Sequence, residues 1–516
     1  MFLIKNLFLR DKKTTMIIIR IQDILLGILV AMILVHRYVP VDISSLWQYL
    51  LVGMVYLIVR FASVYVRKYV SFVVLCWGVC EVIIVLLQEW HWISSNHSWF
   101  DITGTLGNPG PLGGFLGILC AGVINVIYRR RGINEVRTLA WILIGVLLMY
   151  GVIASDSRSS LLAAFTGGVV IFIRRIVYLI QENRIKRVVV ECFSTFMILS
   201  TVSVILYCLK PDSADGRLLV WLNTLLLILD NPIWGWGTGG WTANYMLYQA
   251  DFFASYPQSP FIMLADNVAY PYNEILHIGA EHGLLGMALF IWFVVESFRV
   301  RPSNCLSESL RISFWAFIVF SLFSYSFNVF QLTAMFAFLA ASLELRPVFY
   351  IRIPRLIHKV SFFIVLTILS GLSVHSYGLY KKAWHDPDLL PYFQYNPEIM
   401  YMYSQMETVP DSMRSDILNR TSFLCPDSEI YCMLGDENME KGNFDKSGTY
   451  YRKASNMVTS KITPRYKLFR LYVSKGDTLS AVSYGRNILS FKPKIESTRT
   501  LKMKGEIKSF LHNYNN

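Results

Sequence analysis

The stretch PLGGFLGILCAGVINVIYRRR, residues 111–131, decides the class of fold. Residues 111–128 hold no charged side chain, and three arginines follow them directly. A helix needs about 20 largely apolar residues to cross the hydrocarbon core of a bilayer, and lysine and arginine collect beside spans on the cytoplasmic side. The stretch therefore predicts a membrane-spanning helix whose C-terminal end lies in the cytoplasm.

Comparable apolar runs recur over the first three quarters of the chain. Together they predict about eleven spans, near residues 16–35, 46–62, 69–87, 111–128, 138–154, 159–173, 188–208, 272–298, 311–327, 329–345 and 359–378. The expected fold class is therefore all-α: a polytopic helical membrane protein in which residues 1–378 form the membrane domain.

Charge is distributed unevenly along the chain. Residues 1–379 hold 28 Lys/Arg and 20 Asp/Glu, whereas the much shorter tail, residues 380–516, holds 20 and 15. The tail thus has the charge density of a soluble domain. A chain that is 54% hydrophobic and only 16% charged is not an ordinary cytosolic enzyme. The net charge of +13 reflects membrane topology, so we infer no nucleic-acid partner.

Basic residues fall mainly on one side of the predicted bundle. Twenty-three of them lie in the short loops on that side, against four on the other, which are Arg37, Arg158, Lys210 and Arg217. Because cytoplasmic loops carry the excess of basic residues, we expect the N-terminus in the cytoplasm. An odd number of spans then places residues 379–516 outside, together with a long loop at 210–271.

Two related segments lie 34 residues apart in the tail. KGNFDKSGTYYRKASNM begins at Lys441, and KGDTLSAVSYGRNILSFKP begins at Lys475. That offset is the period of tetratricopeptide repeats (TPRs), and each Lys-Gly would form the tight turn between paired helices. Residues 379–516 are therefore expected to form an extracytoplasmic, TPR-like helical domain with a groove for a protein partner. An unrelated helical tail is the other interpretation.

Sparse polar residues beside the outer ends of spans mark the expected site, because charges are costly there. TGTLGNPGPLGG, residues 103–114, enters a span and places Asn108 among glycines and prolines. SDSRSS, residues 155–160, places Arg158 at the outer membrane face. Its guanidinium offers several donors to a phosphate or pyrophosphate. Equally, Arg158 could snorkel to the interface or pair with Asp156.

The outer loop contains DGRLLVWLNTLLLILDNPIWGWGTGGW, residues 215–241. Arg217 and Trp221 stand four residues apart and so share one face of an amphipathic helix, which Asn231 and Pro232 should end. The glycines that follow lack the βαβ unit of a nucleotide-binding motif. Aromatic side chains beside an arginine instead suit an anionic, lipid-linked donor at the bilayer surface.

Residues 270–286, YPYNEILHIGAEHGLLG, lead into the eighth predicted span. Asn273, His277 and Glu281 recur every four residues and share one helical face, with Glu274 beside them. Histidine and glutamate can accept a proton from a hydroxyl nucleophile. The other interpretation is that these groups cap the helix and lie at the membrane interface.

Taken in this order, the four segments resemble the O-antigen ligase and polymerase family of membrane glycosyltransferases. The resemblance rests on GNP after an outer loop, SR at a helix mouth, R-x-x-x-W with DNP-x-x-G-x-G-x-G-x-W, and N followed by nine residues and G-x-x-G. It implies transfer of a glycan from a polyprenyl pyrophosphate carrier at the periplasmic face of the bacterial inner membrane. The acceptor would be a lipid, a growing glycan or a protein. The resemblance implies no nucleotide sugar, no metal and no other cofactor.

The resemblance also implies roles for particular residues. Arg158 and Arg217 match the family's donor-binding arginines and would neutralise the pyrophosphate. Asn108 and Trp221 belong to the matching motifs and would make further contacts with the substrate.

The last motif carries the expected catalytic residues, with one departure. Asn273 and Glu281 match it, but the family has histidine where this chain has Tyr272. A tyrosine with a reference pKa of about 10 is a poor general base, although it can orient a hydroxyl or a phosphate. The base would then be His277, Glu274 or Glu281.

Ligase, polymerase and protein O-oligosaccharyltransferase stay open as variants of this interpretation. A transporter is the alternative from another class, favoured by Glu81 within a span and by Asp23 near Arg20. Transporters concentrate such charges at the midplane between internal repeats, and the sequence has no such repeat. A scaffold whose function lies in the tail is the third interpretation.

Overall fold

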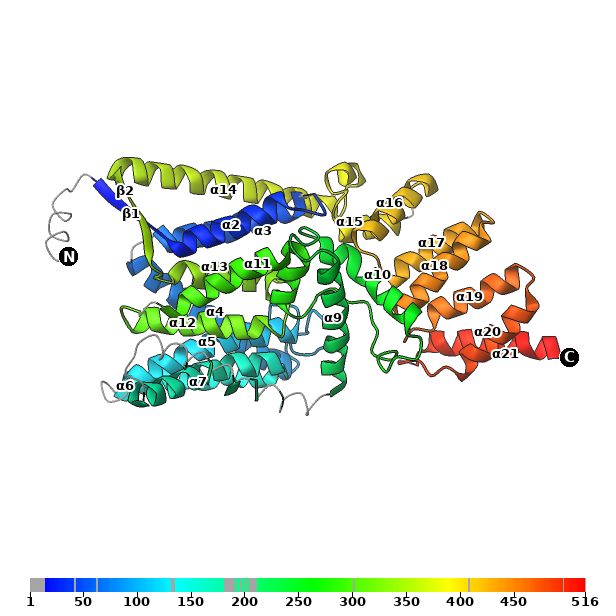
Figure 1. Ribbon diagram of the computed structural model, residues 1–516, viewed down its shortest axis with the longest axis horizontal. Coiled ribbons are helices and arrows are strands. Elements are labelled where there is room, and N and C mark those ends of the chain that lie inside the picture. The colour runs from blue at the N-terminus through cyan, green and yellow to red at the C-terminus, as the bar shows by residue number, and fades with distance from the viewer. Residues whose placement is uncertain are drawn as a thin grey trace.

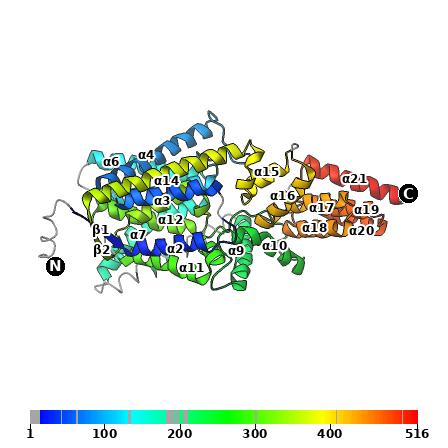
Figure 2. The same cartoon turned by 90° about the horizontal axis from the view of Figure 1, so that it is seen from above.

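The computed structural model describes residues 14–515 apart from 41–42, 62–63, 131–134, most of 181–210, 300–301, 407–408 and 495. Two groups of helices lie end to end in it. An apolar bundle carries the N-terminus, and a smaller group of helices carries the C-terminus (Figures 1 and 2).

The bundle contains the helices that the apolar runs predict. In the described part of the chain these are α2 (Ile21–Val35), α3 (Ile43–Phe61), α4 (Val64–Glu89), α5 (Pro109–Arg130), α6 (Glu135–Ala154), α7 (Arg158–Ile180), α11 (Glu274–Arg299), α12 (Cys305–Ser321), α13 (Phe330–Ser342) and α14 (Arg355–Ala383). Among the described residues, six helices are long and apolar enough to cross a membrane: α4, α5, α6, α7, α11 and α14. Shorter apolar helices are α2, α3 and α13. The chain is an all-α polytopic membrane protein, as expected. The predicted span 188–208 lies largely outside the described residues, and the total of eleven stays a prediction.

Two of the predicted spans have wrong boundaries. Residues 16–20 belong not to a helix but to strand β1 (Thr14–Arg20), which pairs antiparallel with β2 (Pro347–Pro354). The run of β-branched residues at Ile17, Ile18 and Ile19 suits a strand, and a short apolar run does not by itself distinguish strand from helix. The second error lies at 322–327, because α12 ends at Ser321 and a short 3₁₀ helix, η1 (Ser326–Asn328), follows.

Helix α5 runs through the middle of the bundle. Its side chains Phe115, Leu116 and Ile118 are fully buried. Small residues bring α5 and α7 close together, since a Cβ on Gly117 would stand 2.5 Å from the Ser160 carbonyl oxygen. Close contact of this kind is typical of helices packed in membranes. It places the start of α7, and with it Arg158, beside the start of α5.

Two helices occupy the segment expected as an outer loop, residues 210–271. They are α9 (Pro211–Asp230) and α10 (Gly240–Ser255). Helix α9 ends immediately before Asn231 and Pro232, which confirms the predicted helix end. It stands across the end of the bundle, between the apolar helices and the C-terminal group (Figure 1).

The C-terminal group is helical throughout its described length. Its elements are η2 (Pro387–Tyr392), α15 (Pro397–Ser404), α16 (Asp411–Leu424), α17 (Ser428–Glu440), α18 (Phe444–Met457), α19 (Thr463–Ser474), α20 (Thr478–Ser490) and α21 (Thr498–Asn515). Gly442 separates α17 from α18 with φ of 75°, and Gly476 separates α19 from α20 with φ of 74°. The two Lys-Gly turns are therefore confirmed. That the domain is TPR-like stays a prediction.

Candidate active site

Arg217 extends from α9 to two other segments of the chain. Its Nη1 donates to the carbonyl oxygen of Phe323 over 2.9 Å. Its guanidinium carbon lies 5.4 Å from the centre of the Tyr272 ring, which is cation–π contact distance. One turn further along α9, Trp221 Nε1 donates to the Pro271 carbonyl oxygen over 3.1 Å. Three residues that the sequence predicts for the site, Arg217, Trp221 and Tyr272, are thus brought together.

A second positive charge, that of Arg158, acts on Arg217. Burial lowers the pKa of Arg217; the nearby Tyr272 opposes this effect, and the positive charge of Arg158 adds to it. Arg158 is half-buried at the first residue of α7. In the part of the chain that the structure describes, no carboxylate forms an ion pair with Arg217. Two neighbouring cations in a poorly hydrated place favour a bound anion.

Tyr272 has the backbone of a sharp corner and a phenol that keeps its proton. Its φ of 54° lies in the left-handed region, which is unusual for a residue other than glycine. Burial raises the pKa of Tyr272 above its ordinary value, and Arg217 only partly opposes the rise. The phenol can therefore donate a hydrogen bond to a substrate oxygen but does not serve as a base near neutral pH.

Asn273 begins helix α11. Its Oδ1 accepts hydrogen bonds from the backbone amides of Ile275 and Leu276, at 3.0 and 3.1 Å. These are the bonds of a helix N-cap. For Asn273, the interpretation as a helix cap is therefore confirmed. The cap fixes Tyr272 at the mouth of the helix.

Three titratable residues in the first turns of α11, Glu274, His277 and Glu281, form one connected row. His277 Nδ1 lies 3.1 Å from Glu274 Oε2, and His277 Nε2 lies 3.5 Å from Glu281 Oε1. Both carboxylates also accept hydrogen bonds from backbone amides of other segments. Glu274 Oε1 accepts from the Phe327 amide at 2.7 Å, and Glu281 Oε1 accepts from the Gly239 amide at 2.7 Å. With a carboxylate at each ring nitrogen, His277 can donate to both only as imidazolium.

The glycine-rich loop after α9 is held on two sides. Thr238 exchanges backbone hydrogen bonds with the chain after α2, since its amide donates to the His36 carbonyl oxygen at 3.0 Å and its carbonyl accepts from Tyr38 at 3.1 Å. On the other side, the amide of Gly237 donates to the Glu281 carbonyl oxygen at 2.7 Å. The glycines of this motif therefore allow backbone segments to approach each other closely. This agrees with the sequence, in which the βαβ unit of a nucleotide-binding motif does not surround them.

Asn108 lies at the start of α5. Its Oδ1 accepts from the Gly110 amide over 3.0 Å, and its carbonyl oxygen accepts from the Leu112 amide over 3.2 Å. The side chain thus helps to begin α5. Next to it, Ser160 of α7 donates to the Gly110 carbonyl oxygen over 3.4 Å, which links the GNP and SR motifs.

The structure adds two aromatic residues that the sequence analysis missed. Tyr270 stacks on Tyr325 with 4.3 Å between ring centres and 7° between planes, and the Tyr325 ring meets the Tyr272 ring edge-on at 5.6 Å. Tyr325 lies in the break between α12 and α13, which the sequence analysis assigned to a span. The polar residues of SYSFN, 324–328, are the signal that could have revealed this break.

The charges that favour a transporter have structural partners. Glu81 accepts from Trp77 Nε1 at 2.8 Å and from the Thr105 amide at 2.9 Å, so it holds the loop before α5. Asp23 pairs with Arg60 at 2.7 Å and accepts from the Arg20 amide at 2.8 Å. Both carboxylates therefore have a structural role in holding neighbouring segments together.

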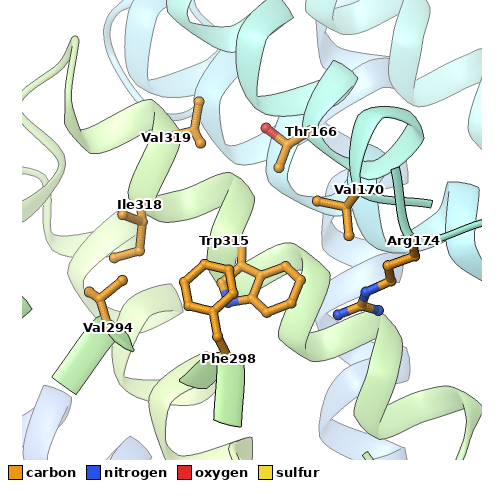
Figure 3. Close-up of a pocket in the computed structure, with 8 residues that line it drawn as sticks. All are labelled: Thr166, Val170, Arg174, Val294, Phe298, Trp315, Ile318 and Val319. Atoms are coloured by element: carbon orange, nitrogen blue, oxygen red, sulfur yellow. The ribbon is translucent and has the colours of Figure 1, made fainter. Parts of the chain in front are cut away.

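A pocket between α7, α11 and α12 lies apart from these residues. It is lined by Thr166, Val170, Arg174, Val294, Phe298, Trp315, Ile318 and Val319, and Figure 3 shows Phe298 and Trp315 stacked beside Arg174. It shares no residue with the cluster around Arg217. Its apolar lining suits the interior of a bundle better than a polar reaction.

Fold and site together define a polytopic helical membrane protein with a cluster of basic and aromatic residues at one end of its bundle. Residues 112–291 match the family model described as O-Antigen ligase. The chain is therefore similar to O-antigen ligases over this segment, which agrees with the family resemblance of the motifs. Members of this family are membrane glycosyltransferases of the ligase and polymerase type. No curated protein and no solved structure matches the chain.

Proposed function

We propose that this protein transfers a glycan from a polyprenyl pyrophosphate carrier to an acceptor hydroxyl. The observation that carries the proposal is the half-buried guanidinium of Arg217, which has Arg158 nearby and no carboxylate partner among the described residues. A desolvated charge costs several kcal/mol unless an opposite charge compensates it. A pyrophosphate brings more than one negative charge, and a lipid-linked one reaches this place from the bilayer.

In the proposed reaction the acceptor oxygen attacks the anomeric carbon of the donor sugar. The bond from that carbon to the phosphate oxygen breaks, and polyprenyl pyrophosphate leaves with the electron pair. Arg217 and Arg158 would stabilise the charge on the leaving phosphate. Tyr272, with its phenol protonated, would donate a hydrogen bond to a phosphate or acceptor oxygen. Trp221 and Asn108 would shape the site around the donor.

The acceptor proton needs a destination, and we place it on Glu281. Of the three candidates on α11, the Glu274 side chain is only 1% exposed, whereas those of His277 and Glu281 are 16% and 11% exposed. A His277 that donates to both carboxylates does not accept a proton. Glu281, held by His277 and Gly239, would accept it.

The proposed orientation puts this chemistry at the periplasmic face of the bacterial inner membrane. Basic residues predominate in the loops on the opposite side, so the N-terminus would be cytoplasmic and residues 379–516 periplasmic. The C-terminal helices would then stand where an acceptor arrives. They favour a protein as acceptor or as assembly partner, because helical repeat arrays commonly bind proteins.

The first experiment is to measure the glycan left on polyprenyl pyrophosphate when the protein is deleted. Accumulated single repeat units identify a polymerase. Accumulated complete glycan identifies a transferase to lipid or protein, and glycoprotein staining then distinguishes the two acceptors. If neither accumulates, the proposed transfer is wrong and the transporter interpretation replaces it.

A further inference from the structure

Three tyrosines from two separate segments meet beside Arg217. Tyr270 and Tyr272 precede α11, and Tyr325 lies between α12 and α13. Tyr270 and Tyr325 are parallel at 4.3 Å, and Tyr272 meets Tyr325 edge-on while facing Arg217. All three tyrosines are half-buried. A stack of two rings that keeps part of its surface open, next to an anion site, is more than the packing of a core requires.

The C-terminal domain reaches the same cluster. Burial raises the pKa of the Tyr270 phenol, and the negative charge of Glu398 in the first turn of α15 adds to the rise. Glu398 is therefore close enough to act on Tyr270 electrostatically. Its side chain is exposed.

The approach of the tail is fixed by hydrogen bonds far apart in sequence. Thr459 Oγ1 donates to the Ile262 carbonyl oxygen and Ser460 Oγ to that of Ala265, each over 2.7 Å. The buried Gln249 of α10 donates to Asp266 and Met457 carbonyl oxygens at 3.0 and 2.6 Å. The segment that presents Tyr270 is thereby tied to the tail.

We propose that the stacked rings of Tyr270 and Tyr325, with the exposed Glu398 of the C-terminal domain nearby, bind a pyranose ring of the glycan beside the pyrophosphate. This inference rests on the proposed function and adds the sugar-binding surface to it. Aromatic faces suit the C–H faces of a pyranose, because their electron-rich surface attracts polarised hydrogens and excludes water. A carboxylate accepts hydrogen bonds from sugar hydroxyls, which supplies the polar half of the recognition.

The surface lies close to Arg217, since Tyr325 contacts Tyr272 and Tyr272 faces the guanidinium. A sugar next to a bound pyrophosphate would therefore meet these rings. The pyranose can come from the donor or from a glycan acceptor, and the two sources share this chemistry.

The test measures binding by the full-length protein in lipid nanodiscs. The probes are polyprenyl pyrophosphate with its glycan and polyprenyl pyrophosphate without one. Tyr270→Leu removes the aromatic face at similar size, Tyr270→Phe keeps it, and Glu398→Gln removes the charge. Tyr514→Leu, at an exposed tyrosine near the C-terminus, is the distant control. Thermal unfolding of each variant checks that it folds.

We expect Tyr270→Leu to weaken binding of the glycan-bearing carrier by about three- to tenfold, as loss of one aromatic contact implies, and to leave binding of the bare carrier unchanged. Tyr270→Phe should lose less than Tyr270→Leu. If donor binding is unchanged but KM for a glycan acceptor rises by a similar factor, the surface holds the acceptor sugar. If Tyr270→Leu behaves like Tyr514→Leu in both measurements, the inference is wrong.

The same assay separates failure of the inference from failure of the proposed function. Arg217→Met should lose affinity for both carriers, since both carry the pyrophosphate. If the wild type binds both carriers as weakly as Arg217→Met does, the proposed function is wrong, and the proposed sugar-binding surface is wrong with it.

Discussion

The backbone of Gly235 lies directly against the backbone of Gly283. A Cβ on Gly283 would stand 2.8 Å from the Gly235 nitrogen, and a Cβ on Gly235 would stand 2.5 Å from the Gly283 nitrogen. Gly283 interrupts α11 with φ of 63° and ψ of −167°, a region that is almost exclusive to glycine. The amide of Trp236 enters the break and donates to the Ala280 carbonyl oxygen over 2.9 Å. The glycine motif after α9 and the glycine motif within α11 therefore pack backbone against backbone. We call this contact, formed by Gly235, Trp236, Ala280 and Gly283, the α9–α11 joint.

The joint predicts the effect of Gly283→Ala. Alanine would adopt this backbone at a cost of about 1–3 kcal/mol, and its Cβ would stand 2.2 Å from the Ile233 carbonyl oxygen. We expect a lower midpoint of thermal unfolding and loss of transfer together. Gly168→Ala in α7, where a Cβ meets nothing within 4 Å, is the matched control and should retain both. A Gly283→Ala protein as stable as the control would contradict the joint.

Arg217→Met should separate function from stability. The substitution removes one hydrogen bond, to Phe323, but also removes a desolvated cation that Arg158 repels. We therefore expect thermal stability equal to or above that of the wild type and a fall in transfer of roughly 10²–10³-fold. Arg470→Ala, at an exposed position of α19, is the control. A large loss of stability in Arg217→Met would mean that the arginine serves the fold.

The raised pKa of Tyr272 predicts the pH dependence. Because burial lifts its pKa above the ordinary value near 10, the phenol stays protonated up to at least about pH 10. Its contribution to stability is complete below that value and is lost as the pH rises through the folded pKa. We expect no inflection from Tyr272 in the pH–rate profile between about pH 6 and 9. Tyr272→Phe keeps the ring over Arg217 and should retain transfer within about tenfold, the cost of one hydrogen bond. Complete loss in a stable Tyr272→Phe protein would instead make the hydroxyl essential.

Glu281→Gln tests the proposed proton acceptor. The amide oxygen can still accept from Gly239, so the loop should keep its place, but the group no longer takes up a proton. We expect transfer to fall by roughly 10²-fold or more with little change in the unfolding midpoint. Hydrogen exchange of residues 235–239 serves as the structural control. Wild-type activity in Glu281→Gln would remove Glu281 from the reaction.

Apolar periodicity was sufficient for the helices of the bundle, because a span must satisfy its backbone internally and so leaves a long apolar run. The same rule could not find β1, since three successive isoleucines satisfy helix and strand alike. It also extended the span at 311–327 through Tyr325, whose neighbours are serines. In both places the partner segment decides the conformation, and that partner is remote in sequence.

The site was predictable in part. Arg217 and Trp221 were found from their helical spacing, and Tyr272 from its place in the family motif. Tyr270 and Tyr325 were not predicted, because neither belongs to a periodic pattern or has a charged neighbour that distinguishes it. The row on α11 was also found, but its spacing did not reveal that Glu274 and Glu281 each hold backbone from another segment.

Hydrogen bonds from Thr459 and Ser460 join the tail to the segment before α11. Residues 256–273 contain no helix or strand, so their conformation depends on what holds them. Thr459→Val with Ser460→Ala removes two of those bonds, to Ile262 and Ala265. A bond is worth about 1 kcal/mol, so hydrogen exchange in residues 262–272 should accelerate by roughly 5–30-fold. Transfer should fall with it, because Tyr270 and Tyr272 would no longer be held beside Arg217.

Thr449→Val is the matched control, because the Thr449 hydroxyl donates to the Asp445 carbonyl oxygen of its own helix over 2.9 Å. A scaffold tail that recruits partners from a distance predicts the opposite result. It would leave both exchange in residues 262–272 and transfer to a simple soluble acceptor unchanged in the double variant. That outcome would make the tail an independent module, whereas faster exchange with lost transfer would make it a wall of the active site.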